Sequence, residues 1–165
     1  MGYFMGKSFL NSNTQFIMEM IQAPTAENAI SKIRNAITDG ATAIGFQMGY
    51  LEKQYRTEKV LRSIFAEAGD KPIYFTNYRT HLNVGTSDEE LMDGLMFGLK
   101  CGATLIDVMG DAFNPSPEEL TTDKNAIAKQ MKFIKIGLRH GARLSVCHIT
   151  HNRGQGGLSF YANLQ

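Results

Sequence analysis

A short phrase that occurs three times along the chain constrains its fold more than any other feature. The copies begin at Gly40, Gly102 and Gly141, and each is a Gly-Ala pair that follows a helix-like segment and opens an apolar run. A glycine just past a helix supplies the left-handed residue that often ends it. The apolar run after it is typical of a buried strand. These repeated units predict a parallel α/β architecture, with functional sites at the carboxyl ends of the strands.

The repeat can be followed through most of the sequence. Apolar residues at helical spacing, with capping residues such as Thr25 and Ser87, indicate helices, and short apolar runs indicate strands. The predicted strands cover residues 16–22, 43–48, 73–77, 104–109 and 143–148. The predicted helices cover residues 25–39, 56–68, 87–101 and 125–139.

The pattern divides the chain into three parts. Residues 1–15 precede the first predicted strand and form an N-terminal extension. Residues 16–150 contain all the strand–helix units and form one domain, as the length of the chain allows. Residues 151–165 hold three glycines and no helical stripe, so we expect an irregular tail.

Composition excludes several classes of function. A net charge of +1 and the absence of a basic stripe give no reason to expect a nucleic-acid partner. No apolar run approaches the roughly 20 residues of a membrane span, and the N-terminus is a poor signal peptide. The two cysteines, Cys101 and Cys147, form no disulfide framework. We therefore expect a cytoplasmic protein with no membrane partner.

Polar side chains follow the predicted strands. Gln47 ends the second strand, Asn77 and Arg79 follow the third, Asp107 ends the fourth and His148 ends the fifth. Strand ends are often polar simply because they leave the core. Their convergence at one end of a parallel sheet is nevertheless the arrangement from which ligand sites in these folds are built.

His148 and Arg79 carry the most specific chemistry. An imidazole at the mouth of the sheet can take and return a proton near neutral pH, although a structural histidine is an equal alternative. A guanidinium after a strand can bind a carboxylate through two hydrogen bonds, although a surface arginine would look the same. His148 and His151 have no third metal ligand nearby, so no metal site is expected.

Four stretches of the sequence resemble one enzyme family. They are Asp-Gly-Ala-Thr-Ala-Ile-Gly at residues 39–45, Pro-Ile-Tyr-Phe-Thr-Asn-Tyr-Arg at 72–79, Gly-Ala-Thr-Leu-Ile-Asp-Val at 102–108 and Ser-Val-Cys-His at 145–148. In their order and spacing the chain is similar to the type I 3-dehydroquinate dehydratases, and closest to a divergent branch of them. These are Schiff-base-forming (β/α)8-barrel lyases of the shikimate pathway of aromatic amino acid biosynthesis.

The resemblance implies a role for each candidate residue. His148 stands at the position of the general acid and base, and Arg79 at that of an arginine that contacts the substrate carboxylate or a hydroxyl. Gln47 and Asn83 replace charged residues of the family and retain the ability to form hydrogen bonds. Asn77 and Asp107 complete the expected binding set, although Asp107 could equally be a buried hydrogen-bond anchor. The implied substrate is a cyclic hydroxy-keto acid, and no cofactor is expected.

The same resemblance also predicts what the chain lacks. The family's imine-forming lysine lies on a sixth strand, and this sequence supplies about five of the eight strand–helix units of a TIM barrel. Two functions follow. One is a dehydratase-like lyase whose Schiff-base lysine is absent from this chain, which alone would be inactive. The alternative is a non-catalytic remnant or a partial barrel that binds small acids. The open sheet edges predict a homo-oligomer or a tendency to aggregate.

Overall fold

The fold is an alternation of strands and helices. The computed structural model describes residues 16–115, 122–139 and 143–147. The strands are β1 (Met18–Ile21), β2 (Ala43–Gln47), β3 (Ile73–Thr76), β4 (Leu105–Met109) and β5 (Arg143–Cys147). The α-helices are α1 (Ala26–Thr38), α2 (Glu58–Ala66), α3 (Asp88–Cys101) and α4 (Lys124–Arg139). The strands and helices predicted from the sequence are all confirmed.

Local capping explains where the helices begin and end. The Thr25 hydroxyl accepts a hydrogen bond from the Asn28 amide at the start of α1. Ser87 and Glu90 form the predicted capping box of α3, in which each side chain accepts from the other residue's amide. Gly102 ends α3 with a φ of 118°, a left-handed conformation that favours glycine. Each of these residues lies within a few positions of the helix end that it marks, so the signals can be recognised in the sequence.

Two short turns between β2 and α2 were not predicted. They are the 3-10 turns η1 (Met48–Tyr50) and η2 (Lys53–Tyr55). Segments of three residues are too short to show a helical period. The Arg56 side chain supports this connection, since its Nε–H donates to the Leu51 carbonyl at 2.6 Å and an Nη2–H donates to the Gly49 carbonyl at 3.2 Å.

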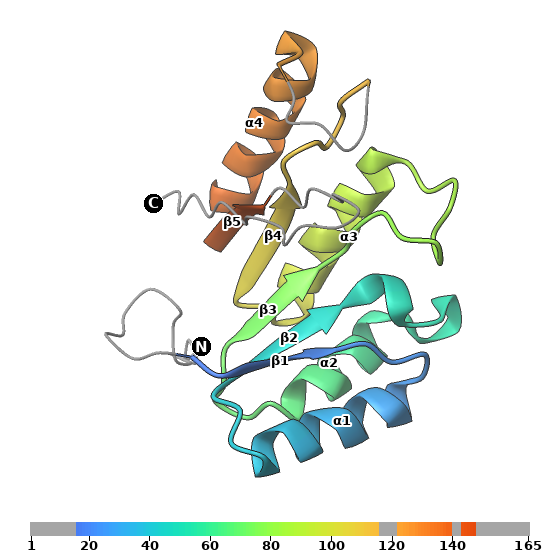
Figure 1. The fold of residues 1–165 in the computed structure, drawn as a ribbon, viewed down its shortest axis with the longest axis vertical. Coiled ribbons are helices and arrows are strands. Elements are labelled where there is room, and N and C mark those ends of the chain that lie inside the picture. The colour runs from blue at the N-terminus through green and yellow to red at the C-terminus, as the bar shows by residue number, and fades with distance from the viewer. Residues whose placement is uncertain (1–15, 116–121, 140–142, 148–165) are drawn as a thin grey trace, which may run out of the picture.

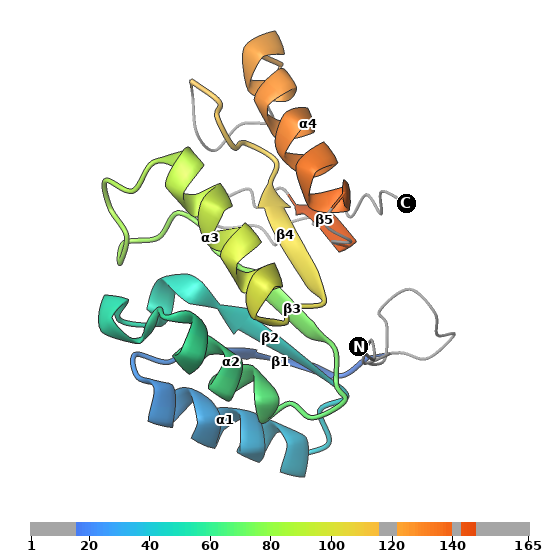
Figure 2. The same ribbon diagram turned by 180° about the vertical axis from the view of Figure 1, so that it is seen from behind.

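The five strands form one parallel sheet whose spatial order, β1-β2-β3-β4-β5, equals their order in the chain. All four α-helices lie on the same face of this sheet, as the two opposite views show (Figures 1 and 2). A parallel sheet in chain order with helices outside is the arrangement of a (β/α)8 barrel. The chain therefore has the α/β fold of a partial TIM barrel.

Aromatic side chains fill the layer between the sheet and the helices. The Phe46 ring from β2 stacks on the Phe75 ring from β3, with centroids 6.1 Å apart. Both rings meet the edge of Phe65 from α2, at 5.5 and 5.9 Å. Edge-to-face contacts of this kind add stability beyond the area that the rings bury. Phe46 and Phe75 therefore fix which face of each strand points toward the helices.

The opposite face of the sheet, here called the inner face, follows from alternation along the strands. It carries Gly45 and Gln47 on β2, Tyr74 and Thr76 on β3, Leu105 and Asp107 on β4, and Arg143 on β5. Two rows cross the strands in register. One row pairs Gly45, Tyr74, Leu105 and Arg143, and the next pairs Gln47, Thr76, Asp107 and Ser145.

Several sequence predictions concern residues outside the described part of the chain. They include the third Gly-Ala phrase at residues 141–142, His148, the extension at residues 1–15 and the tail at residues 151–165. The domain boundaries drawn from the sequence therefore stay predictions. Among the described residues, no helix is both long and apolar enough to cross a membrane.

Candidate functional site

A buried carboxylate lies at the centre of the inner face. Asp107 is 0% exposed and accepts hydrogen bonds on Oδ2 from the hydroxyls of Tyr74, at 2.5 Å, and Tyr78. The two hydroxyls lie 3.2 Å apart. Tyr74 lies within β3, and Tyr78 continues its alternation, so both reach the inner face beside β4. The expected position of Asp107 in a polar site and its alternative role as a hydrogen-bond anchor are both compatible with this geometry.

Three buried polar atoms of residues on the inner face have no hydrogen-bond partner among the described residues. They are the second carboxylate oxygen of Asp107, Oδ1, the hydroxyl oxygen of Thr76 and the Nη1 atom of Arg143. Thr76 is, like Asp107, 0% exposed. Their positions on β3, β4 and β5 place all three residues on the inner face. Buried polar groups in native proteins are nearly always paired, so unpaired groups on one face indicate a place where a ligand or water binds.

Gln47 extends the polar region toward β1. Its Oε1 accepts a hydrogen bond of 2.8 Å from the Nε2 amide of Gln22, which follows β1. Gln47 lies on the same inner-face row as Thr76 and Asp107. We refer to Gln47, Tyr74, Thr76, Tyr78, Asp107 and Arg143 together as the inner-face cluster. It offers acceptors, donors and one cation.

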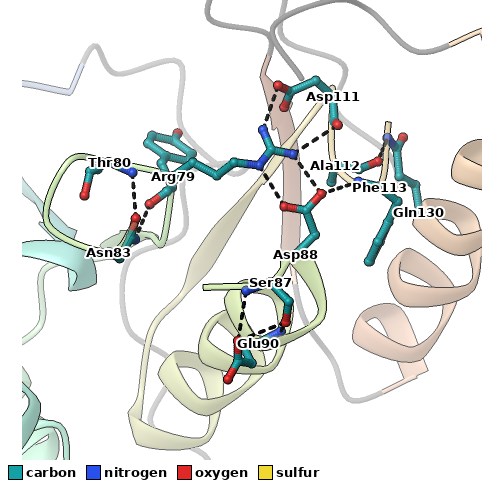
Figure 3. Close-up of polar contacts among 11 residues, drawn as sticks. Arg79, Thr80, Asn83, Ser87, Asp88, Glu90, Asp111, Ala112, Phe113 and Gln130 are labelled. Atoms are coloured by element: carbon teal, nitrogen blue, oxygen red, sulfur yellow. Dashed lines mark hydrogen bonds and ion pairs between the residues drawn. The ribbon is translucent and has the colours of Figure 1, made fainter. Parts of the chain in front are cut away.

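Arg79, the predicted carboxylate binder, is already paired with two carboxylates (Figure 3). Its Nε–H and Nη2–H groups bind the two oxygens of Asp88 at 2.7 and 2.8 Å. Its Nη1–H binds Asp111 Oδ2 at 2.8 Å, and Nη2 also donates to the Asp111 carbonyl at 3.2 Å. Four of its five N–H donors thus have acceptors among the described residues. This group joins β3, α3 and the loop after β4.

Mutual hydrogen bonding shifts the pKa values of this group. Burial disfavours the charged form of Asp88, but hydrogen bonds from Arg79 and from the Phe113 amide outweigh it and hold the pKa of Asp88 below its usual value. The hydrogen bond to Asp88 raises the pKa of Arg79. The Phe113 amide reaches Asp88 Oδ2 at 2.5 Å, and Phe113 has a φ of 64°. Arg79 and Asp88 therefore both stay charged at neutral pH.

The side chains of the two predicted asparagines make their hydrogen bonds with backbone groups rather than with side chains of the inner-face cluster. Asn83 accepts from the Thr80 amide at 2.7 Å and donates to the Tyr78 carbonyl at 2.7 Å, so it shapes its own loop (Figure 3). Asn77 is buried and donates to the Leu91 carbonyl of α3 at 3.0 Å. Asn77 therefore points toward the helices, on the opposite face from Asp107.

The other predictions from the sequence concern His148, the lysines and a metal site. His148 comes directly after β5 in the sequence but lies outside the described residues. Nine of the ten lysines belong to the described part of the chain, and none of these nine is on a strand. The described part of the chain contains no group of three or more His, Cys, Asp or Glu side chains that could hold a metal ion.

Four members of the cluster were missed by sequence reasoning. Tyr74, Thr76, Tyr78 and Arg143 were not proposed as site residues, although Thr76 lies on the same row as Asp107. Alternation along β3 and β4 was a usable signal for Tyr74 and Thr76. Arg143 opens β5, and only the pairing of Leu105 with Arg143 shows that it shares their face.

Comparisons with known proteins identify the fold. No family model matches the sequence, and no curated protein matches it. Among solved structures, the 3-dehydroquinate dehydratase from Enterococcus faecalis is 18% identical, with a TM-score of 0.60, over 81% of this chain and 52% of that one. The dehydratase from Geobacillus kaustophilus HTA426 is 12% identical, with a TM-score of 0.57, over 81% and 49%.

A third structure makes the class explicit. It is a type I 3-dehydroquinate dehydratase from Clostridium difficile with covalently modified comenic acid, 16% identical with a TM-score of 0.56, over 79% of this chain and 49% of that one. The chain spans about half the length of these dehydratases. At such low identity the likeness establishes the fold, and it confirms at that level the resemblance seen in the sequence. The chain thus shares the partial-barrel fold of the type I 3-dehydroquinate dehydratases over about half of their length.

Proposed function

We propose that this chain carries the substrate-binding part of a lyase site of the 3-dehydroquinate dehydratase kind, acting on a cyclic hydroxy-keto acid. One observation carries the proposal. Polar residues of three adjacent strands, Gln47, Thr76 and Asp107, share one row on the inner face of a dehydratase-like sheet, toward the carboxyl ends of the strands where barrels of this kind bind their substrates. The shikimate pathway is the metabolic setting in which such a substrate occurs.

The chemistry is the removal of water from the ring. A base takes the proton from the carbon next to the ketone, a carbon–carbon double bond forms, the carbon–oxygen bond to the departing hydroxyl breaks, and the proton leaves with that hydroxyl as water. His148 is our candidate for this proton transfer, since imidazole can act as base and acid near neutral pH. Gln47 and Asp107 are proposed to hold hydroxyls.

Three of the expected binding residues have different roles in this proposal. Arg79 and Asn83 lie in the loop at the carboxyl end of β3, and we retain them at the edge of the site. Arg79 has one N–H donor left for a substrate, because its others bind Asp88 and Asp111. Asn77 faces α3, so we leave it out.

Turnover of 3-dehydroquinate by the full 165-residue chain tests the proposal. The product contains a conjugated enone, whose ultraviolet absorption reports the reaction directly. The resemblance predicts no turnover by this chain alone, because the imine-forming lysine is expected on a sixth strand. Turnover that falls at least tenfold in His148→Ala and Asp107→Asn, and that survives in Asp93→Asn, which removes an exposed carboxylate on α3, would support the lyase. Absence of turnover in the parent chain would contradict a lyase function of this chain alone.

A binding-only partial barrel is the second candidate. The observation that favours it is that the nine described lysines lie on helices and connections, whereas a Schiff-base lysine needs a desolvated site. Borohydride treatment in the presence of substrate separates the two candidates. A covalent adduct on a lysine, found by mass spectrometry, supports the lyase, and binding of quinate without an adduct or turnover supports the binding protein.

A further inference from the structure

We propose that Arg143, Thr76 and Asp107 form a hydroxy-acid subsite on the inner face. In this subsite the Arg143 guanidinium binds the ligand's carboxylate, and the Thr76 hydroxyl and Asp107 Oδ1 bind one of its hydroxyls. The inference deepens the proposed function, because the same face would hold the substrate, but it concerns binding and does not need turnover. It transfers the role of carboxylate anchor from Arg79 to Arg143.

The first argument is the set of unpaired atoms. Asp107 Oδ1, Thr76 Oγ1 and Arg143 Nη1 are each buried and each lack a hydrogen-bond partner. Within the described residues, the side-chain hydrogen bonds found for these three residues are the two that Asp107 accepts on its other oxygen, Oδ2. The set combines one cationic donor, one anionic acceptor and one hydroxyl that can do either. A ligand with a carboxylate and a hydroxyl would satisfy all three atoms.

The second argument is spacing. Thr76 and Asp107 are paired on adjacent strands, which lie about 4.8 Å apart. Arg143 pairs with Leu105, two residues before Asp107, and two residues of a parallel strand rise about 6.6 Å. The backbone of Arg143 is thus displaced from that of Asp107 by one strand and one row. A ring that carries its acid and hydroxyl on different carbons would span such points.

The third argument is charge. Arg79 and its two aspartates carry a net charge of −1, because one guanidinium faces two carboxylates. That group would repel a carboxylate ligand. No carboxylate among the described residues lies within ion-pair distance of Arg143. Asp107 in turn is stabilised by two tyrosine hydroxyls on Oδ2, which leaves Oδ1 to accept from a ligand hydroxyl.

Calorimetry on the full chain with three probes tests the subsite. Quinate carries a carboxylate and ring hydroxyls, quinamide lacks the charge, and cyclohexanecarboxylate lacks the hydroxyls. We expect quinate to bind at least tenfold more tightly than either analogue. A charge-assisted hydrogen bond typically contributes about 10- to 100-fold in affinity.

Matched variants assign the preference to residues. Arg143→Gln should lower quinate affinity about 10- to 100-fold and remove the preference for quinate over quinamide. Arg139→Gln, which removes an exposed guanidinium from the last turn of α4, should change neither. Thr76→Val and Asp107→Asn should reduce the preference for quinate over cyclohexanecarboxylate. Circular dichroism checks that each variant folds. If Arg143→Gln does not fold, Arg143→Lys replaces it as a variant that keeps the charge but not the guanidinium.

The outcomes separate this inference from the proposed function. Equal binding of quinate and quinamide by the parent chain, or an unchanged preference in Arg143→Gln, overturns the subsite even if dehydroquinate is turned over. Failure of quinate to bind at all also overturns it, and would mean that water alone occupies the unpaired atoms. Arg143-dependent binding without turnover supports the subsite and contradicts only the lyase.

Discussion

Arg79 joins three segments that are far apart in the sequence. It follows β3, Asp88 opens α3, and Asp111 lies in the loop after β4 (Figure 3). Its side chain is 28% exposed, and those of Asp88 and Asp111 are 15% and 13% exposed. Bidentate pairs in partly buried settings are stronger and more directional than exposed pairs. The geometry therefore gives Arg79 a structural role.

Replacement of Arg79 tests this role. Arg79→Gln should lower the free energy of unfolding by about 1–3 kcal/mol, because it removes four hydrogen bonds and leaves two aspartates facing each other. Urea denaturation measures the change. Arg34→Gln, which breaks the exposed pair with Glu67, should leave stability nearly unchanged. Equal effects of the two substitutions would contradict a special role for Arg79.

At the residue scale, sequence reasoning recognised the type of side chain but not its partners. It identified Arg79, Asp107 and Gln47 because each stands where a strand ends. It did not foresee that Asp88 reaches Arg79, since α3 begins nine residues later and only the packed fold brings the two together. Local spacing locates polar groups, whereas long-range contacts decide which of them are already satisfied.

At the scale of the elements, helix α3 packs unusually close to the sheet. An added Cβ at Gly98 would lie 2.3 Å from Phe75 Cε1, and one at Gly94 would lie 2.2 Å from Asn77 Nδ2. Both glycines face β3 and let the helix approach it. This contact seats Phe75 in the aromatic layer and Asn77 against the Leu91 carbonyl.

A single methyl group should disturb that packing. Gly98→Ala should destabilise the fold by about 1–3 kcal/mol through overpacking, although alanine favours a helix over glycine by about 1 kcal/mol. Phe75→Leu in the same chain should relieve part of the clash. The double variant should therefore lose less than the sum of the two single losses, as measured by thermal or urea unfolding. Strictly additive losses would show that Gly98 and Phe75 do not interact.

The elements themselves were well predicted because their signals are local. Caps such as Thr25 and Ser87 and the repeated Gly-Ala phrase lie within a few residues of the boundaries that they mark. Register is different, since it depends on how whole strands pair. Arg143 could not be placed beside the inner-face cluster until the pairing of β4 with β5 was known.

At the scale of the whole molecule, the sheet is open where a complete barrel would close. Among the described residues, β1 and β5 each pair with a single neighbour, so both present an edge. Met18 and Met20 on the inner face of β1 are 42% and 37% exposed. Parallel sheets are normally covered on both faces, and unpaired edges favour association. The dehydratases of this fold are about twice as long as the matched region.

We therefore expect copies of this chain to associate through the inner face and its β1 edge. Light scattering should show a mass that rises with concentration in the micromolar range. Met18→Lys should reduce this association, because it places a charge on the partly exposed β1 part of the inner face. Met131→Lys should not, because Met131, 41% exposed, lies on α4 on the other side of the sheet (Figure 2). A stable monomer at all concentrations, or an equal effect of both lysines, would show that the inner face is not the contact surface.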